Sequence, residues 1–223
     1  MSQVAENIAA IEKKIAQAAQ QTARDPASVH LVAVSKKQPT ERIRAALEAG
    51  QRLFGENRVQ EAQAHWGDLK KEYPDIRLHL IGPLQTNKVK EAVALFDCIE
   101  TVDREKLAEK LAAEMAAQDR RLPCFIQVNT GEEEQKAGVA PAALPAFYDF
   151  CRKDCGLDIR GLMCIPPADE PPALHFAFLK KLAGSCGLDD LSMGMSGDFE
   201  KAVALGATYV RVGTALFGVR QES

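Results

Sequence analysis

The 223-residue sequence lacks long apolar runs and an excess of charge of one sign. Lys and Arg number 28 against 31 Asp and Glu, so we expect no basic stripe of the kind that follows a nucleic acid backbone. No apolar run approaches the ~20 residues needed to span a bilayer. Near the N-terminus, Ile8, Ile11 and Ile15 stand at helical spacing among charged residues, unlike the continuous apolar core of a secretory peptide. These absences predict a cytoplasmic protein that binds neither nucleic acid nor membrane.

Cysteine pairs at metal-binding spacing are also absent. The six cysteines form no C-x-x-C motif and lie mostly inside apolar stretches, at Cys98, Cys124, Cys151, Cys155, Cys164 and Cys186. Cys151 and Cys155 stand one helical turn apart, but no histidine or carboxylate accompanies them at matching spacing. We therefore expect reduced core thiols, with neither a disulfide framework nor a metal site.

What the sequence does contain is a regular alternation of short β-branched runs and longer helical patterns from residue 29 onward. The expected strands cover residues 30–36, 52–57, 77–82, 97–102, 123–129, 159–165, 191–194 and 208–213. The helical stretches between them are long enough to cross back over a parallel sheet. The pattern predicts the α/β class, as a single (β/α)8 TIM-type barrel with an added N-terminal helix, in one domain spanning residues 1–223. A doubly wound open sheet is the alternative.

Turn and cap signals mark one helix clearly. In the stretch "TERIRAALEAG", Thr40 is the expected N-cap and Gly50 the left-handed residue that ends the helix.

Lys36 is the first candidate functional residue, because it ends the apolar run "LVAVSKKQP". Side chains alternate along a strand, so Val32, Val34 and Lys36 share one face, and Lys37 is turned away or already in a loop. A lysine that caps an apolar column in a barrel is desolvated, which favours the neutral, nucleophilic amine that forms an imine with an aldehyde. The alternative is a lysine that reaches water or pairs with an acid at the strand end.

The last two expected strands supply an anion site. In "TYVRVGTALFG", Tyr209, Arg211 and Gly213 are expected to face the barrel interior. Gly213 and Thr214 offer an accessible backbone and a hydroxyl, and Ser196 in "LSMGMSGDFEKAV" precedes a helix N-terminus. Phosphate sites after strands seven and eight recur in this barrel. Taken singly, Ser196 also fits a helix N-cap and Gly213 a tight turn.

An imine-forming amine beside a phosphate site matches pyridoxal 5′-phosphate, which carries both an aldehyde and a phosphate. Strand one adjoins strand eight in a closed barrel, so Lys36 and the anion site are expected in one pocket. Arg211 would then face the pyridine nitrogen and oppose its protonation, because two like charges would meet in a dry site. The alternative is that Arg211 pairs with a glutamate across the barrel.

Seven motifs closely resemble the pyridoxal phosphate homeostasis protein family. They run in register over nearly the whole chain, as "LVAVSKKQP", "FGENRVQEA", "HLIGPLQTNK", "IQVNTGEEEQKAGV", "GLMCIP", "LSMGMSGDFEKAV" and "YVRVGTALFG". The resemblance implies an alanine-racemase-type barrel without the second, β-rich domain of the racemases. It also implies that the cofactor is held on a lysine without a known catalysed reaction.

The resemblance assigns roles residue by residue. Lys36 resembles the Schiff-base lysine, Arg211 the residue facing the pyridine nitrogen, and Ser196, Gly213 and Thr214 the phosphate ligands. Three strand-end residues would contact the ring: Asn57, His79 and Met163. His79 also fits a hydrogen-bonded core histidine and Met163 plain packing. The run Glu132 to Glu134 departs from the commoner family form, and we hypothesise that Lys136 beside it assists cofactor transfer.

The function expected from this resemblance is storage, buffering or delivery of pyridoxal phosphate without catalytic turnover. The chain is expected to be a monomer, with PLP-dependent apoenzymes as its partners. One alternative is a PLP-dependent amino acid racemase or lyase. Racemisation needs a base on each face of the ring, and none of the three tyrosines is an obvious second base. A cofactor-free Schiff-base aldolase is a third option and predicts a colourless protein.

Overall fold

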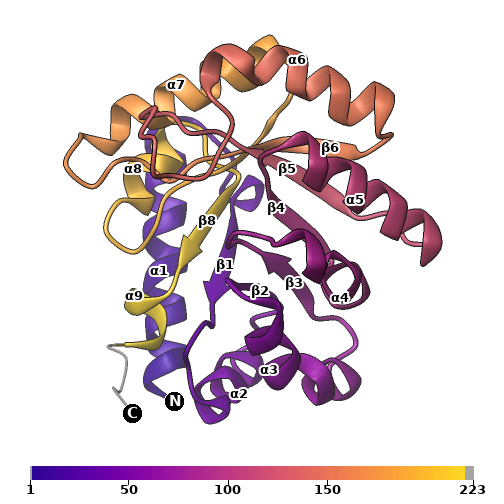
Figure 1. The fold of residues 1–223 in the computed structure, drawn as a ribbon. Coiled ribbons are helices and arrows are strands. Elements are labelled where there is room, and N and C mark those ends of the chain that lie inside the picture. Colours follow the sequence, from indigo (N-terminus) through magenta and orange to yellow (C-terminus); the bar gives the residue numbers. More distant parts are fainter. Residues whose placement is uncertain (1, 219–223) are drawn as a thin grey trace.

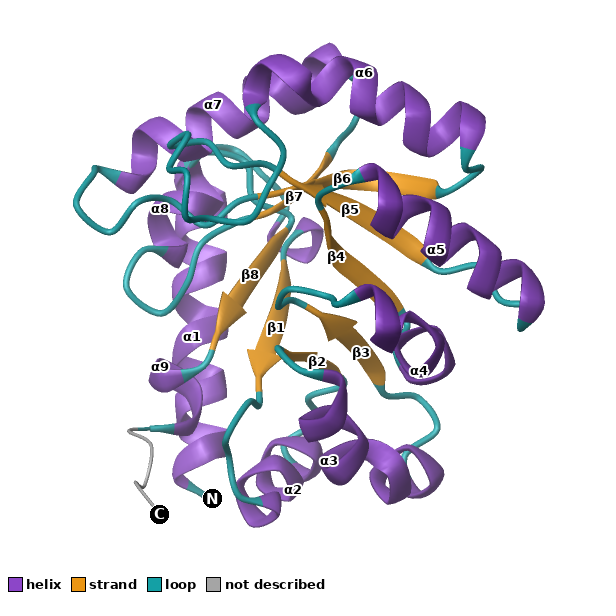
Figure 2. Ribbon diagram, in the orientation of Figure 1, coloured by secondary structure: helices purple, strands orange, loops and turns teal. Residues whose placement is uncertain are grey.

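Eight parallel strands close into a barrel in the computed structural model, which describes residues 2–218 (Figures 1 and 2). The strands follow one another around the barrel in chain order: β1 (His30–Val34), β2 (Leu53–Glu56), β3 (Arg77–Leu80), β4 (Cys98–Val102), β5 (Pro123–Gln127), β6 (Asp158–Met163), β7 (Asp190–Ser192) and β8 (Tyr209–Val212). β8 pairs with β1, with Arg211 opposite Val32, and this pairing closes the barrel. The predicted (β/α)8 fold is confirmed, and the open sheet is excluded.

Helices surround the barrel, and all but the first and the last of them connect consecutive strands (Figure 2). They are α1 (Gln3–Gln21), α2 (Thr40–Glu48), α3 (Val59–Glu72), α4 (Val89–Leu95), α5 (Glu105–Ala117), α6 (Leu144–Asp149), α7 (Pro172–Ser185), α8 (Phe199–Ala204) and α9 (Thr214–Phe217). α6 continues into a π-helical turn over Phe150–Asp154. Among the described residues, no helix is long and apolar enough to cross a membrane.

The N-terminal helix α1 covers the side of the barrel where the chain closes. It packs against α8 and α9, and Figure 1 shows it running beside β8. Ile8, Ile11 and Ile15 are all buried, as their spacing predicts. The Asn7 side chain donates a hydrogen bond of 2.9 Å to the Leu216 carbonyl, which ties α1 to the end of the barrel.

Side chains alternate between the barrel interior and the layer beneath the helices. Leu31 and Ala33 belong to the main core that β1 shares with the helices. Val32 points the other way, since a Cβ added at Gly55 of β2 would lie 2.9 Å from its Cγ1. The inward face of β1 therefore leads through Val32 and Val34 to residue 36, as the alternation predicts.

One predicted helix cap is wrong and the helix end is confirmed. α2 begins at Thr40 itself, and the cap position is taken by Pro39, which makes no side-chain capping bond. Gly50 has a φ of +95°, so it is the left-handed residue that follows the helix. Proline fixes the φ that a helix start requires, which explains why Thr40 is not needed as the cap.

Candidate functional site

A cavity of about 280 Å³ opens at the carboxyl ends of the strands. Most of its lining residues stand just after the end of a strand, where this barrel places its ligands. The lining consists of Val34, Lys36, Gln38, Asn57, Ile81, Ile165, Met195, Ser196, Gly197, Arg211, Gly213 and Thr214. Six of the eight residues predicted from the sequence are therefore brought together here.

The two neighbouring lysines after β1 have different surroundings. Lys36 is partly buried and lines the cavity. Lys37 is exposed and has a φ of +55°, and its backbone N–H donates to the Glu61 carboxylate. The left-handed turn at Lys37 directs the chain away from the barrel, so only Lys36 continues the inward face of β1.

The residues after β7 and β8, where an anion site is predicted, line one concave part of the cavity. The Ser196 Oγ accepts hydrogen bonds of 3.3 Å from the backbone N–H groups of Gly213 and Ala215, which holds the two segments together. Within residues 2–218, the backbone N–H groups of Ser196 and Gly197 have no hydrogen-bond acceptor. Several amide donors that converge beside a hydroxyl are the arrangement that binds a phosphate.

Arg211 forms the floor of the cavity from inside the barrel. Its side chain is almost entirely buried, and it donates to Ser192 Oγ at 2.7 Å and to the Cys164 carbonyl at 2.9 Å. Its backbone N–H donates to the Gly194 carbonyl at 3.0 Å. The two side-chain bonds, to β7 and to the residue after β6, hold the guanidinium in one position, as a planar fork of donors allows.

Two predicted ring contacts, His79 and Met163, do not line the cavity. Met163 is fully buried and packs inside the barrel against Cys98 and Phe125. His79 lies deeper in the bore, with its Nδ1 at 2.6 Å from Glu100 Oε1. These surroundings match the alternatives of plain packing for Met163 and a hydrogen-bonded core histidine for His79.

Glu100 is a buried acid that the sequence analysis did not single out. Burial alone would raise its pKa, but the contacts with His79, Arg211 and Ser192 outweigh burial and hold the pKa of Glu100 below its usual value. The carboxylate is therefore ionised at the centre of the barrel.

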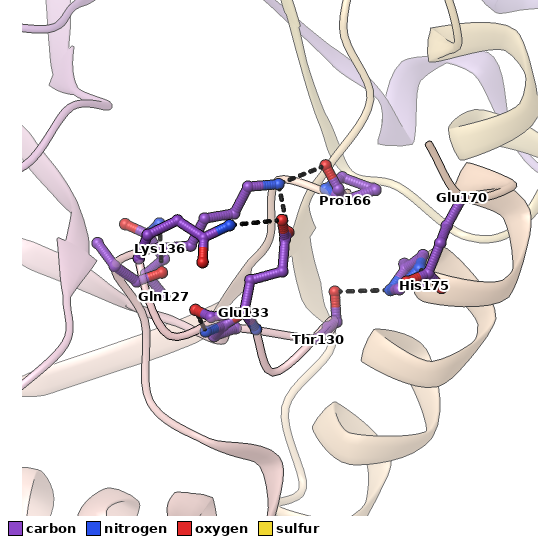
Figure 3. Close-up of polar contacts among 10 residues, drawn as sticks. Gln127, Thr130, Glu133, Lys136, Pro166, Glu170 and His175 are labelled. Carbon is purple, nitrogen blue, oxygen red and sulfur yellow. Dashed lines mark hydrogen bonds and ion pairs between the residues drawn. The ribbon is translucent and has the colours of Figure 1, made fainter. Parts of the chain in front are cut away.

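Lys136 lies in the loop after β5, at the rim of the barrel (Figure 3). Its Nζ forms an ion pair of 2.5 Å with Glu133 Oε2 and donates to the Pro166 carbonyl at 3.4 Å. Nearer to β5 in this loop, Thr130 Oγ1 lies 3.0 Å from Nδ1 of His175 on α7. Lys136 does not line the cavity. Its partner Pro166 directly follows the lining residue Ile165, so the hydrogen bond connects the loop after β5 to the edge of the cavity. Its assistance in cofactor transfer stays a prediction.

Several lining residues were missed by the sequence reading. Ile165 and Met195 follow β6 and β7 within three residues, so inspection of every strand end would have found them. Gln38 is harder to find, because it returns to the cavity only through the turn at Lys37. In that turn, the Gln38 N–H donates to the Ser35 carbonyl at 3.1 Å.

Comparisons with known proteins agree with this architecture. The family model described as "Alanine racemase, N-terminal domain" matches residues 7–221. A relative from Pseudomonas aeruginosa, named pyridoxal phosphate homeostasis protein, is 45% identical over 228 residues, which cover 99% of this chain and 97% of the relative. PipY from Synechococcus elongatus has been solved without and with PLP bound. Against these two structures this chain has TM-scores of 0.87 and 0.83 and identities of 41% and 40%, covering 97% of this chain and 100% of PipY.

The resemblance in sequence, the closed barrel and the full-length matches lead to the same assignment. The chain belongs to the pyridoxal phosphate homeostasis protein family, whose barrel is that of the alanine racemase N-terminal domain.

Proposed function

We propose that this chain binds pyridoxal 5′-phosphate in the cavity at the carboxyl ends of its strands, and that it stores, buffers or delivers the cofactor without catalytic turnover. The observation that carries the proposal is that Lys36 and the Ser196–Gly213–Thr214 concavity line one cavity. The pairing of Val32 with Arg211 supports it, since it makes β1 and β8 neighbours. Lys36 and Gly213 therefore follow adjacent strands.

The residues of the cavity fit the cofactor in chemistry. The amides of Ser196 and Gly197 and the hydroxyl of Thr214 are donors for a phosphate dianion. Lys36 supplies an amine for the aldehyde, and the buried Arg211 supplies a fixed cation that would face the pyridine nitrogen. Asn57 lines the cavity after β2 and is proposed to contact the ring, whereas His79 and Met163 do not line it.

A reversible covalent bond suits storage and delivery. When the Lys36 amine condenses with an aldehyde, a C=N bond forms and one water molecule leaves; hydrolysis returns the same amine and aldehyde. Because the free aldehyde reacts with other amines, holding it in a cavity protects both the cofactor and its surroundings. In this proposal the protein is one domain that works as a monomer in the cytoplasm and passes the cofactor to PLP-dependent apoenzymes.

The position of the tyrosines argues against a racemase that takes its second base from such a residue. Tyr209 packs inside the barrel against Phe125, Tyr148 contacts Arg152, and Tyr73 lies by Arg52. None of the chain's three tyrosines lines the cavity that contains Lys36. Racemisation requires a proton donor and acceptor on both faces of the ring.

The experiment compares three purified proteins mixed with pyridoxal phosphate: the wild type, Lys36→Ala and Lys37→Ala. We expect a visible absorption band in the wild type and in Lys37→Ala, and its loss in Lys36→Ala. Borohydride reduction followed by peptide mass analysis should place the phosphopyridoxyl group on Lys36.

Two outcomes contradict the proposal. A colourless wild type with the cofactor in excess rules out the binding site and leaves the aldolase alternative. Sustained racemisation of amino acids by the loaded protein rules out the non-catalytic role. Transfer is measured separately, as the recovery of activity by a PLP-dependent apoenzyme mixed with the loaded protein.

A further inference from the structure

Arg211 is a buried cation that no carboxylate contacts directly among residues 2–218. Only 4% of its surface is exposed, and its side-chain partners are the Ser192 hydroxyl and the Cys164 carbonyl. Neither partner carries charge. A guanidinium removed from water without a counterion is strongly destabilised, so the charge must be compensated nearby.

The compensating charge is Glu100, which is reached through Ser192. Ser192 Oγ donates to Glu100 Oε2 at 2.5 Å and accepts from Arg211 at 2.7 Å. Arginine can only donate and an ionised carboxylate can only accept, so both hydrogen bonds have fixed directions. The hydroxyl acts as a bridge between a buried cation and a buried anion.

The bridge crosses the bore of the barrel. Glu100 lies on β4 and Arg211 on β8, which are on opposite sides of the closed sheet (Figure 2). On the other side of Glu100, Oε1 lies 2.6 Å from Nδ1 of His79 on β3. Both carboxylate oxygens are therefore engaged, and the complete row is His79, Glu100, Ser192 and Arg211.

We propose that Glu100, acting through Ser192, is the positioning residue that keeps Arg211 oriented and electrostatically compensated at the floor of the cofactor cavity. The inference rests on the proposed function, because it concerns how Arg211 acts on bound pyridoxal phosphate. It extends that function to a residue that does not touch the cavity. The sequence left two readings of Arg211 open: a residue at the cofactor site, or a partner of a glutamate across the barrel. Both apply here, because Arg211 lines the cavity and is linked to Glu100 through Ser192.

Removing the carboxylate charge changes the site in a defined direction. Without Glu100 the bore carries the uncompensated charge of Arg211. A proton on the bound cofactor or on its bond to Lys36 would then meet greater repulsion. The protonated, visible-absorbing form should therefore lose its proton at a lower pH.

The titratable groups that face Glu100 come from three strands of the barrel. His79 from β3, Cys98 from its own strand, and Tyr209 and Arg211 from β8 surround the carboxylate. Burial raises the pKa of the Cys98 thiol well above its usual value and raises the pKa of Tyr209 to about 12. Both groups stay neutral over the range in which the cofactor would be titrated.

The experiment follows the visible absorption of the loaded protein between about pH 5 and pH 10. The thermal stability of each unloaded protein is measured beside it. We expect the pH at which half of the visible band is lost to fall by about one unit in Glu100→Gln. This pH is called the midpoint below. Ser192→Ala should shift it in the same direction, and Glu100→Asp, which keeps the charge, should restore it toward the wild type. Asp97→Asn is the matched control, because Asp97 is a partly buried acid directly before β4 that pairs with Lys70 outside this row.

The outcomes separate this inference from the proposed function. A wild type without a visible band overturns both. A wild-type band with unchanged midpoints in Glu100→Gln and Ser192→Ala overturns only the role of Glu100, as does an equal shift in Asp97→Asn. If Glu100 were merely structural, its variants would lower the stability of the unloaded protein and leave the midpoint in place. Should Glu100→Gln fail to fold, Ser192→Ala decides the question by the same readout.

Discussion

Individual side chains in this barrel differ sharply in function although they have the same chemistry. Lys36 and Lys37 are adjacent, yet one lines the cavity and the other is exposed at a left-handed turn. Glu56 and Glu100 are both fully buried acids, but they face opposite sides of the sheet. Glu100 lies in the bore, whereas Glu56 contacts α3 through Trp66 and His65. The face of the strand, not the residue type, decides the role.

The Glu56 network predicts a pH-dependent contribution to stability. Glu56 Oε1 accepts from Ser35 Oγ at 2.6 Å and lies 3.1 Å from His65 Nδ1. The hydrogen bond to Glu56 raises the pKa of His65, with the charges of Glu56 and Glu61 acting in the same direction against desolvation. Because the pKa is higher in the folded state, the stabilisation is fully present below the unfolded pKa near 6.5 and is lost as pH rises through the folded pKa.

His65→Gln tests the prediction. Its free energy of unfolding in urea is compared with that of the wild type from below pH 6.5 to above the raised pKa of folded His65. We expect the variant to lose about 1.5–3 kcal/mol at the acidic end, the usual range for a hydrogen bond to a charged group. The loss should be smaller at the alkaline end. In a Glu56→Gln background the pH dependence of the difference should become much smaller, because only the charge of Glu61 still raises the pKa of His65. A difference that grows with pH would contradict the assignment.

At the scale of elements, the loop after β7 is the segment that builds the proposed anion site. Gly194 has a φ of +93°, and a Cβ there would lie 2.5 Å from the Cβ of Ala202 on α8. Its carbonyl also accepts from the backbone N–H of Arg211. The close approach of α8 to this loop therefore requires glycine, and the same approach places Ser196 against Gly213.

Gly194→Ala is expected to destabilise the protein by about 2 kcal/mol or more, because it combines a strained backbone with a steric clash. Affinity for pyridoxal phosphate should fall as well, since the shifted loop carries Ser196. The control is Gly184→Ala in α7, where a Cβ meets nothing within 4 Å and φ is not positive. That variant should stay within about 1 kcal/mol of the wild type. Equal denaturation midpoints for the two variants would refute the argument.

The elements were more predictable from sequence than the site. Eight strands followed from local alternation, and each predicted range overlaps an observed strand, because the pattern of β-branched runs is a property of neighbouring residues. Lys36 and Arg211 followed from the same alternation. The contact of Glu100 with Ser192 spans 92 positions in the sequence, so no local pattern reveals it. A register shift between Ile99 and Val102 on β4 further interrupts the alternation around Glu100.

At the scale of the whole molecule, the proposed cofactor cavity exists only when the barrel is closed. Lys36 follows the first strand, and Ser196 and Gly213 follow the seventh and eighth, so the site unites the two ends of the chain. β8 pairs with β1 over four residue pairs, and α1 covers this closure. A ligand that bridges Lys36 and the anion concavity therefore binds the folded state and not a partly opened one.

Ligand binding should accordingly stabilise the entire fold and not only a local segment. At a pyridoxal phosphate concentration about 100 times its dissociation constant, the free energy of unfolding should rise by about 2.7 kcal/mol. Urea unfolding, followed by circular dichroism at increasing cofactor concentration, measures the rise, with Lys37→Ala as the control that retains it. Lys36→Ala should show a much smaller rise, because only the non-covalent contacts remain. If the cofactor stabilised Lys36→Ala as strongly as the wild type, the covalent anchor would not link the two ends of the barrel. If it left the wild-type transition unchanged, the cavity would not be its binding site.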